Sequence, residues 1–292
     1  MNPMTNSKPL LIMCALLSAA TALAGNFPQD YQAALRLYET GKIAEANDAF
    51  TKLAESGPTQ QAKDAALVQA AYCEARLKHA GGAEALVTRI KDRHLGVLCR
   101  MNLLTFDNKF ADIVTLSKDE DIEQWPDALA FDALFCRGLA FARTRDAGKA
   151  EKDFRAAIQH TVSDYNKGQT YLKLGALFGD ADKKDQRALD AFAAVYSLKP
   201  GLTVQCRAVI ARAKLLAAQG KRDAAIAEFE HLKEVKTQPH WSMGQMGLAE
   251  VYETLGAKDQ AFACYKAIIA SEKAPADLVG LAKSKLNSPT KP

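Results

Sequence analysis

The side chains that most often carry chemistry are scattered along this sequence and form no recognisable motif. The five histidines, His79, His94, His160, His231 and His240, are never three or four residues apart, so no two of them share a helical face as metal ligands would. The sequence contains no glycine-rich phosphate loop, no HExxH and no GxSxG. We therefore predict a protein that is not an enzyme, has no cofactor or metal, and carries its histidines on the surface.

The cysteines show no pattern that predicts catalysis, metal binding or disulfide pairing. Cys14 lies in an apolar N-terminal run, and the other five, Cys73, Cys99, Cys136, Cys206 and Cys264, are at least 26 residues apart with no CxxC among them. Free cysteine behaves as a small apolar residue and is among the most frequently buried types. We expect these five to fill space inside helices as free thiols.

The first 24 residues have the layout of a cleavable export signal. Lys8 precedes an apolar run of 15 residues from Leu10 to Ala24, which ends in Ala22-Leu23-Ala24 before Gly25. A membrane-spanning helix needs about 20 apolar residues. The sequence therefore predicts a signal peptide over 1–24, cleaved between Ala24 and Gly25, and a secreted or periplasmic protein. The alternative is an uncleaved segment that tethers the chain to a membrane.

The charge distribution excludes one class of partner. The 292-residue chain carries 38 Lys and Arg against 34 Asp and Glu, a formal net charge of +4, and no run of basic residues stands out. Proteins that bind nucleic acid need a basic patch to neutralise phosphates. We therefore expect no nucleic-acid partner.

A sequence pattern that repeats along the chain predicts the helices that would position any functional residue. A small residue is followed four positions later by a large apolar one, and three positions later by another apolar one, so that each triplet lies on one face of a helix. The copies are Ala46/Phe50/Leu53, Ala83/Val87/Ile90, Ala150/Phe154/Ala157, Ala188/Phe192/Val195, Ala225/Phe229/Leu232 and Ala261/Tyr265/Ile268. The last four copies start 36 to 38 residues apart, a period typical of a solenoid.

Each repeat is predicted to be a pair of helices. Twelve or thirteen residues before each helix-B alanine stands another small residue, at which we expect the two helices to cross: Ala34, Ala71, Gly138, Gly175, Ala213 and Ala249. Gly41, Gly220 and Gly256 stand at the predicted turns between the helices, where a left-handed backbone favours glycine.

The spacing resembles the tetratricopeptide repeat. Gly138-Leu139-Ala140-Phe141, followed by Ala150, Phe154 and Ala157, is the clearest copy. A second copy, Leu174 to Phe178 with Ala188, Phe192 and Pro200, has a long predicted turn over 179–186 and leans toward the related Sel1-like repeat. The chain is thus similar to tetratricopeptide-repeat proteins (TPR, Sel1-like) of an exported bacterial type.

The resemblance implies an all-α fold, an α-solenoid of stacked antiparallel helix pairs. We expect about seven repeats over 25–271, with a degenerate, shortened one at 93–117 and a bend or joint near 118–127. Residues 272–292 then form a capping helix, with its apolar side made by Leu278, Val279, Leu281, Ala282 and Leu286, and a short disordered tail from Ser288.

The resemblance also implies a binding groove lined by the first helix of each repeat. Counting the crossing residue as position 8, the groove positions of the family fall here on Tyr31, Leu35, Tyr38, Glu39, Val68, Tyr72, Arg76, Asp132, Phe135, Leu139, Arg143, Arg207, Ile210, Lys214, Met246, Glu250 and Glu253. The candidate partner-binding residues are Tyr31, Tyr38, Tyr72, Arg76, Phe135, Arg143, Arg207 and Lys214, because tyrosine and arginine concentrate binding energy. Of these, Tyr38 and Arg143 are expected to be exposed.

The family's chaperone-tail clamp is excluded. That clamp uses asparagine at position 9 to hold a C-terminal carboxylate, whereas this chain has Leu35, Tyr72, Leu139, Ala176, Lys214 and Glu250 there.

The sequence therefore favours a non-enzymatic scaffold that holds a segment of a partner protein in its groove. The first alternative is a membrane-tethered adaptor for a filament or envelope assembly, similar to bacterial kinesin-light-chain-like proteins. The second is an enzyme or glycan binder without a recognisable motif. No residue identifies the partner.

Overall fold

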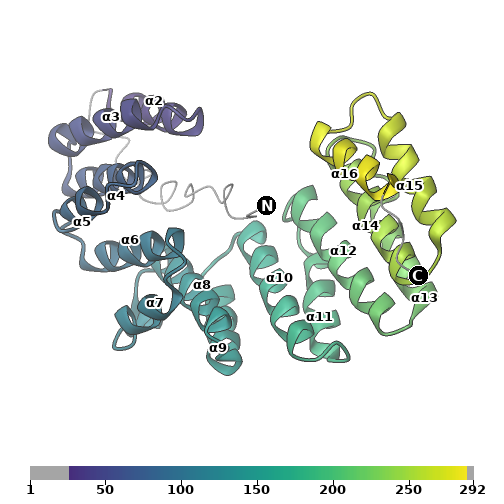
Figure 1. The fold of residues 1–292 in the computed structure, drawn as a ribbon. Helices are drawn as coiled ribbons and strands as arrows, with labels where there is room; N and C mark the ends of the chain where they lie inside the picture. Colours follow the sequence, from purple (N-terminus) through teal and green to yellow (C-terminus); the bar gives the residue numbers. More distant parts are fainter. Residues whose placement is uncertain (1–25, 288–292) are drawn as a thin grey trace. The chain divides into compact units, whose positions relative to one another are not determined.

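The structure, a computed structural model, describes residues 26–287, and it is all-helical over that range (Figure 1). The predicted signal peptide and the predicted tail from Ser288 lie outside the described residues. The α-helices are α2 (Phe27–Glu39), α3 (Ile43–Ser56), α4 (Gln60–Arg76), α5 (Ala80–Val87), α6 (Arg93–Phe106), α7 (Phe110–Leu116), α8 (Asp127–Arg143), α9 (Ala147–Gln159), α10 (Asp164–Ala181), α11 (Gln186–Ala194), α12 (Leu202–Ala218), α13 (Arg222–Ala227), α14 (His240–Thr254), α15 (Lys258–Ala270) and α16 (Ala276–Asn287). Short 3-10 helices are η1 (Ile122–Gln124), η2 (Val195–Ser197) and η3 (Glu228–Leu232).

The helices form seven consecutive pairs followed by α16, which confirms the predicted solenoid. The first helix of each pair, helix A, packs on the second, helix B: α2 on α3, α4 on α5, α6 on α7, α8 on α9, α10 on α11, α12 on α13 and α14 on α15. The chain divides into two compact units, Met1–His160 and Thr161–Pro292. Unit 1 holds the first four pairs and unit 2 holds the last three with α16. In unit 1 the A helices α4, α6 and α8 contact one another in order, and in unit 2 so do α10, α12 and α14.

The same type of turn joins the two helices in six of the seven pairs of the described chain. The residue in the left-handed conformation is Gly41, Lys78, Asn108, Arg145, Gly220 or Gly256, with φ between 57° and 82°. In each case the next amide N–H donates to the carbonyl five residues before it, as Lys42 N does to Leu37 O at 2.9 Å and Asp146 N to Phe141 O at 2.9 Å. This is the hydrogen bond that closes a helix C-terminus. The predicted turn glycines are therefore confirmed, and three non-glycine residues take the same role.

The fifth pair is the exception. The sequence predicted a turn over 179–186, but α10 continues to Ala181 and the turn spans only 182–185. Asp182 accepts a hydrogen bond from the amide of Lys184 at 2.8 Å, and Asp185 caps α11 by accepting from the amide of Arg187 at 2.9 Å. The aspartates thus replace the left-handed residue as the chain-reversing element.

Small residues stand where the helices of a pair cross, as predicted. The ring of Phe154 on α9 fills the space beside Gly138 on α8, and a β-carbon at Gly138 would lie 2.8 Å from two of its ring carbons. Gly175 meets the ring of Phe192 in the same way, at 2.5 Å. A larger residue at either crossing would separate the two helices.

Two buried ion pairs tie helix A to helix B at equivalent places in the two units. Arg137, directly before Gly138, donates through two nitrogens to Asp153 on α9, at 2.7 and 2.9 Å. Arg212, directly before Ala213, pairs with Glu228, which also accepts a hydrogen bond from Tyr196 at 2.6 Å. Both acids are buried and both have their partners, as buried charges require.

The degenerate third repeat is a shortened helix pair, as expected. Met101 replaces the small crossing residue of α6, and Ile113, twelve residues later on α7, is fully buried in the position of the helix-B alanine. After it, Ile122 and Trp125 are buried within unit 1, and α8 begins at Asp127 directly after Pro126. The two units divide after His160, and the bend suggested near 118–127 stays a prediction.

The last helix, α16, packs on α14 and α15. Ala282 is fully buried there, and Leu278, Val279 and Leu286 pack against the same core. Leu281, predicted on the apolar side, is 44% exposed instead. None of the helices within 26–287 is both long and apolar enough to cross a lipid bilayer.

Candidate functional site

The A helices of unit 1 carry six of the eight predicted binding residues, and those of unit 2 carry the other two. Tyr31, Tyr38, Tyr72, Arg76, Phe135 and Arg143 belong to unit 1, whereas Arg207 and Lys214 belong to α12 in unit 2. The predicted groove residues therefore lie on two A-helix surfaces, one in each unit.

The three tyrosines are buried. Tyr31 is fully buried, donates a hydrogen bond to Ala65 O at 3.4 Å, and meets the ring of Phe50 edge to face at 5.1 Å. The Tyr72 hydroxyl accepts a hydrogen bond from Asn102 Nδ2 at 2.9 Å. Burial raises the pKa of both tyrosines well above the usual value, so both hydroxyls stay neutral. Their aromatic rings hold neighbouring helices together.

The prediction that Tyr38 is exposed is wrong. Only 7% of its surface is exposed, because the guanidinium of Arg76 from the next helix pair lies over its ring at 4.7 Å. In this contact the exposed side chain is that of Arg76. A cation lying over an aromatic face stabilises both groups. At this end of the unit 1 surface, a ligand would therefore meet the arginine and not the tyrosine.

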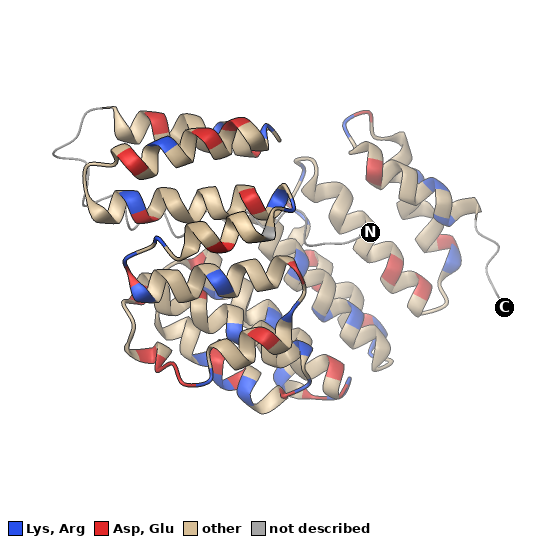
Figure 2. Ribbon diagram, turned by 60° about the vertical axis from the view of Figure 1, so that its left-hand side comes forward, with Lys and Arg blue, Asp and Glu red and all other residues tan. Residues whose placement is uncertain are grey.

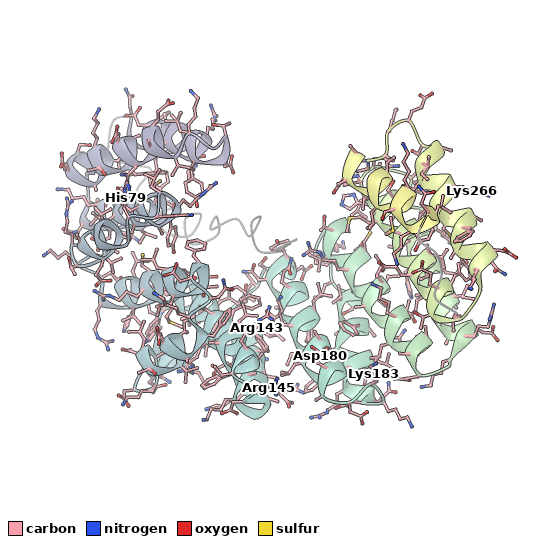
Figure 3. The ribbon with its side chains drawn as sticks, viewed as in Figure 1. His79, Arg143, Arg145, Asp180, Lys183 and Lys266 are labelled. Carbon is pink, nitrogen blue, oxygen red and sulfur yellow. The ribbon has the colours of Figure 1, made fainter. Side chains whose placement is uncertain are left out.

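Arg143 and Phe135 lie on α8. Arg143 is exposed at the end of the helix, as predicted, and its guanidinium lies 5.8 Å from the ring centre of Phe110 on α7 (Figure 3). Phe135 is partly buried between the rings of Phe131 and Phe154, each 5.9 Å away between ring centres. Phe135 thus packs in the core, while Arg143 is available to a partner.

The middle of this surface is made by α4, α6 and α8 together. Phe106, the last residue of α6, is 40% exposed, and its ring meets that of Tyr72 edge to face at 5.7 Å. The Thr105 hydroxyl lies 3.3 Å from the Cys136 sulfur on α8. We use the name unit 1 A-surface for Tyr72, Arg76, Asn102, Thr105, Phe106, Asp132, Cys136 and Arg143.

Asp132 is the one acid of this surface. Burial raises the pKa of its carboxyl from 3.8 to about 7. Its electrostatic neighbours are Tyr72 and Cys136, and both are neutral because burial raises their pKa values too, that of Cys136 to about 11. No hydrogen bond or ion pair reaches the Asp132 carboxyl from any residue in 26–287.

The A helices of unit 2 pair their charges with one another. Lys214 on α12 forms an ion pair with Glu250 on α14, and Glu253 on α14 accepts from Lys285 on α16 at 2.8 Å. Arg207 is exposed on α12. The predicted residue Lys214 is thus exposed but paired within the unit, and the predicted residue Arg207 is exposed as well.

Two solved structures resemble the chain over most of its length. A tetratricopeptide-repeat protein from Parabacteroides merdae is 18% identical, with a TM-score of 0.51, over 90% of this chain and 99% of that one. The C-terminal part of a TPR repeat-containing protein from Cytophaga hutchinsonii is also 18% identical, with a TM-score of 0.50, over 86% of this chain and 98% of that one. The fold is that of a TPR solenoid. No protein-family model and no curated protein sequence matches the chain.

The TPR numbering explains why the sequence did not reveal part of this surface. If Met101 is position 8 of the third repeat, Asn102, Thr105 and Phe106 are positions 9, 12 and 13, all groove positions. Residues 93–117 are predicted to be a degenerate repeat because they lack the later aromatic residue and Ile113 falls only 30 residues after Ala83, so the predicted groove omits their helix A. Ile113 stands in the position of the helix-B alanine, and counting twelve residues back from it gives Met101 as the crossing residue.

The histidines of the described chain have neighbours within it, and its five cysteines are buried as predicted. His79 pairs with Glu74 at 3.2 Å, His160 with Asp127 at 2.7 Å and His240 with Thr203 at 2.9 Å (His79 is labelled in Figure 3). His94 stacks on Trp125, and His231 lies against Tyr196. The five cysteines of the described chain are free and buried, and burial raises their pKa values, to about 12 for Cys73 and Cys99. In the described range, no three His, Cys, Asp or Glu side chains are placed to hold a metal ion.

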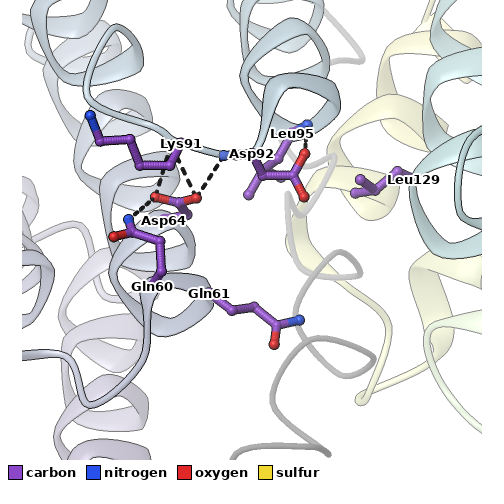
Figure 4. Close-up of a pocket in the computed structure, with 7 residues that line it drawn as sticks. All are labelled: Gln60, Gln61, Asp64, Lys91, Asp92, Leu95 and Leu129. Atoms are coloured by element: carbon purple, nitrogen blue, oxygen red, sulfur yellow. Dashed lines mark hydrogen bonds between the residues drawn. The ribbon is translucent and has the colours of Figure 1, made fainter.

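A small pocket of unit 1 contains a second buried acid, with a structural role. Asp64 on α4 accepts hydrogen bonds from the amides of Lys91 and Asp92, at 2.9 to 3.1 Å, and from the Gln60 side chain at 2.7 Å (Figure 4). These bonds fasten the linker between α5 and α6 to the start of α4. Three donors of the chain therefore hold this carboxylate in a structural role.

Proposed function

We propose that this chain is a non-enzymatic scaffold that binds a segment of a partner protein on the unit 1 A-surface. The observation that carries the proposal is the combination on adjacent helices of an exposed aromatic ring, Phe106, two exposed arginines, Arg76 and Arg143, and an acid without a partner, Asp132. Aromatic and arginine side chains concentrate binding energy at protein interfaces. The TPR-like fold is a further support, because stacked repeats present extended binding surfaces.

The distribution of charged residues favours a protein partner over a nucleic acid. Basic and acidic residues are mixed along the helices of each unit (Figure 2). Association with a polyanion would need basic residues gathered on one face. The proposal therefore specifies a protein segment recognised by a few side chains.

A site-specific crosslinking experiment tests the proposal. A photoreactive phenylalanine analogue replaces Phe106 in one variant and Lys152, which is exposed on helix B of the fourth pair, in the control. Illumination in the source cells followed by mass spectrometry is expected to give a discrete crosslinked partner from position 106 and none of it from position 152. The same partner from both positions, or none from position 106, would refute binding at this surface.

We also propose that the chain is exported, which the layout of Lys8 and the apolar run from Leu10 to Ala24 supports. Intact-mass measurement of the protein from its source is expected to show a chain that begins at Gly25. A mass that retains residues 1–24 would instead favour the membrane-tethered alternative.

A further inference from the structure

Asp132 differs from the buried acids of the described chain in having no partner. Asp64 is held by two backbone amides and Gln60, Asp153 by both nitrogens of Arg137, and Glu228 by Arg212 and Tyr196. Asp132 is half-buried, and within 26–287 it receives no hydrogen bond and no ion pair. Removing part of a carboxyl group from water without a partner costs stability. A carboxyl group of this kind on a binding surface is explained if a ligand supplies the missing group.

No basic side chain of the unit 1 A-surface pairs with Asp132. The Tyr72 hydroxyl accepts from Asn102, and the Cys136 sulfur lies beside Thr105. The two arginines of this surface lie over rings, Arg76 over Tyr38 and Arg143 over Phe110. Over residues 26–287 the chain therefore places no cation on Asp132, and the position fits a positive charge supplied by a partner.

The surroundings also suit the apolar part of a long basic side chain. Phe106 and Asp132 come from the adjacent helices α6 and α8, and both interact with Tyr72: the Phe106 ring meets the Tyr72 ring edge to face, and the Asp132 carboxyl acts on Tyr72 through its charge. Lysine and arginine bury their aliphatic stems along apolar surface while the charged end finds a partner. Phe106, 40% exposed on the adjacent helix, offers such a surface.

We propose that Asp132 receives a lysine or arginine side chain of the bound partner segment, with the stem of that side chain lying on Phe106. This inference rests on the proposed function, because it names the chemistry that the unit 1 A-surface selects. A groove that clamps a C-terminal carboxylate selects a negative charge, whereas Asp132 selects a positive one.

Binding of defined peptides tests the inference. Four pools of short random peptides carry a fluorescent label and have their central residue fixed as lysine, arginine, norleucine or glutamate. Their affinities are measured for the full chain, for Asp132→Asn and for Asp112→Asn, a control that changes an exposed acid on α7. The wild type and the control are expected to bind the lysine and arginine pools about tenfold more tightly than the norleucine pool, the size of one well-enclosed charge pair.

The outcomes separate this inference from the proposed function. Asp132→Asn is expected to bind all four pools with one affinity, that of the wild type for norleucine, and to melt no lower than the wild type. Equal binding of the lysine and norleucine pools by the wild type, or a preference that survives in Asp132→Asn, overturns the inference. The crosslink from position 106 does not depend on this charge, so its result decides the proposed function independently.

Discussion

At the residue scale, burial without a partner makes Asp132 a source of pH-dependent stability. The unfolded chain releases this proton near pH 4, whereas the folded chain holds it up to about pH 7. The folded state therefore binds more protons across this interval, and the free energy of unfolding falls as the pH rises through it. The titratable groups that interact electrostatically with Asp132 are Tyr72 and Cys136, and both stay neutral in this window because burial raises their pKa values.

We predict that Asp132→Asn stabilises the chain at about pH 8 and changes little at about pH 5, where the wild-type acid is already neutral. The raised pKa of Asp132 sets an upper bound of about 4 kcal/mol on the gain, and partial solvent access reduces the expected gain to about 1 to 3 kcal/mol. Urea unfolding of both proteins across this pH range measures the difference. Asp112→Asn is the matched control and should give a difference that is flat with pH.

If Asp132→Asn destabilises the chain at both pH values, the carboxyl has a structural partner and is not available to a ligand. If the difference is flat, burial does not shift the titration of Asp132.

At the element scale, the crossing of α8 and α9 depends on the absence of a side chain at Gly138. A β-carbon there would lie 2.8 Å from two ring carbons of Phe154, so any larger residue must displace α9 or the ring. We predict that Gly138→Leu lowers the free energy of unfolding of unit 1 by about 1 to 3 kcal/mol or more through overpacking. Urea unfolding followed by circular dichroism measures the effect.

Gly148→Ala is the control for that substitution. Gly148 lies in α9, and a β-carbon there would meet no atom within 4 Å, so alanine should leave stability unchanged or raise it by up to about 1 kcal/mol through its higher helix propensity. Equal unfolding curves for Gly138→Leu and the wild type would mean that the helices do not cross at Gly138.

At the scale of the whole molecule, each unit has buried apolar clusters of its own. One cluster of buried side chains runs from Phe27 to Ala157 inside unit 1, and three others, around Val195, Cys206 and Tyr265, lie inside unit 2. Val162, two residues after the division between the units, is 96% exposed. A segment without buried contacts is a preferred site of proteolysis.

We predict that residues 26–160 and 161–287, expressed separately, each fold with native helicity and unfold cooperatively. Each fragment retains whole helix pairs and its own core, and nearest-neighbour contacts hold repeat proteins together. Far-UV circular dichroism and thermal unfolding of the two fragments are the measurements. A fragment that is unfolded on its own would show that its core depends on the other unit.

The sequence by itself determined the helix pairs, their register and the turn glycines, because these follow from local rules. A small residue is needed where two helices cross, and a left-handed residue ends a helix, so both leave a signal at a fixed spacing. The same rules explain why Gly41 and Gly138 were placed correctly. The third repeat lacks the later aromatic residue and is shortened, so it was predicted to be degenerate, and its groove residues Asn102 and Phe106 were missed.

Only the tertiary structure decided which groove positions reach a ligand. Position in a repeat says which way a side chain points, but its exposure depends on what the next pair places over it. Arg76 covers Tyr38 and Lys214 pairs with Glu250, and neither contact can be derived from either residue alone. Asp132 lies in the sequence as one acid among 34 Asp and Glu. Whether it finds a partner depends on which side chains the neighbouring helices bring to it, and packing between distant segments is what a sequence pattern does not specify.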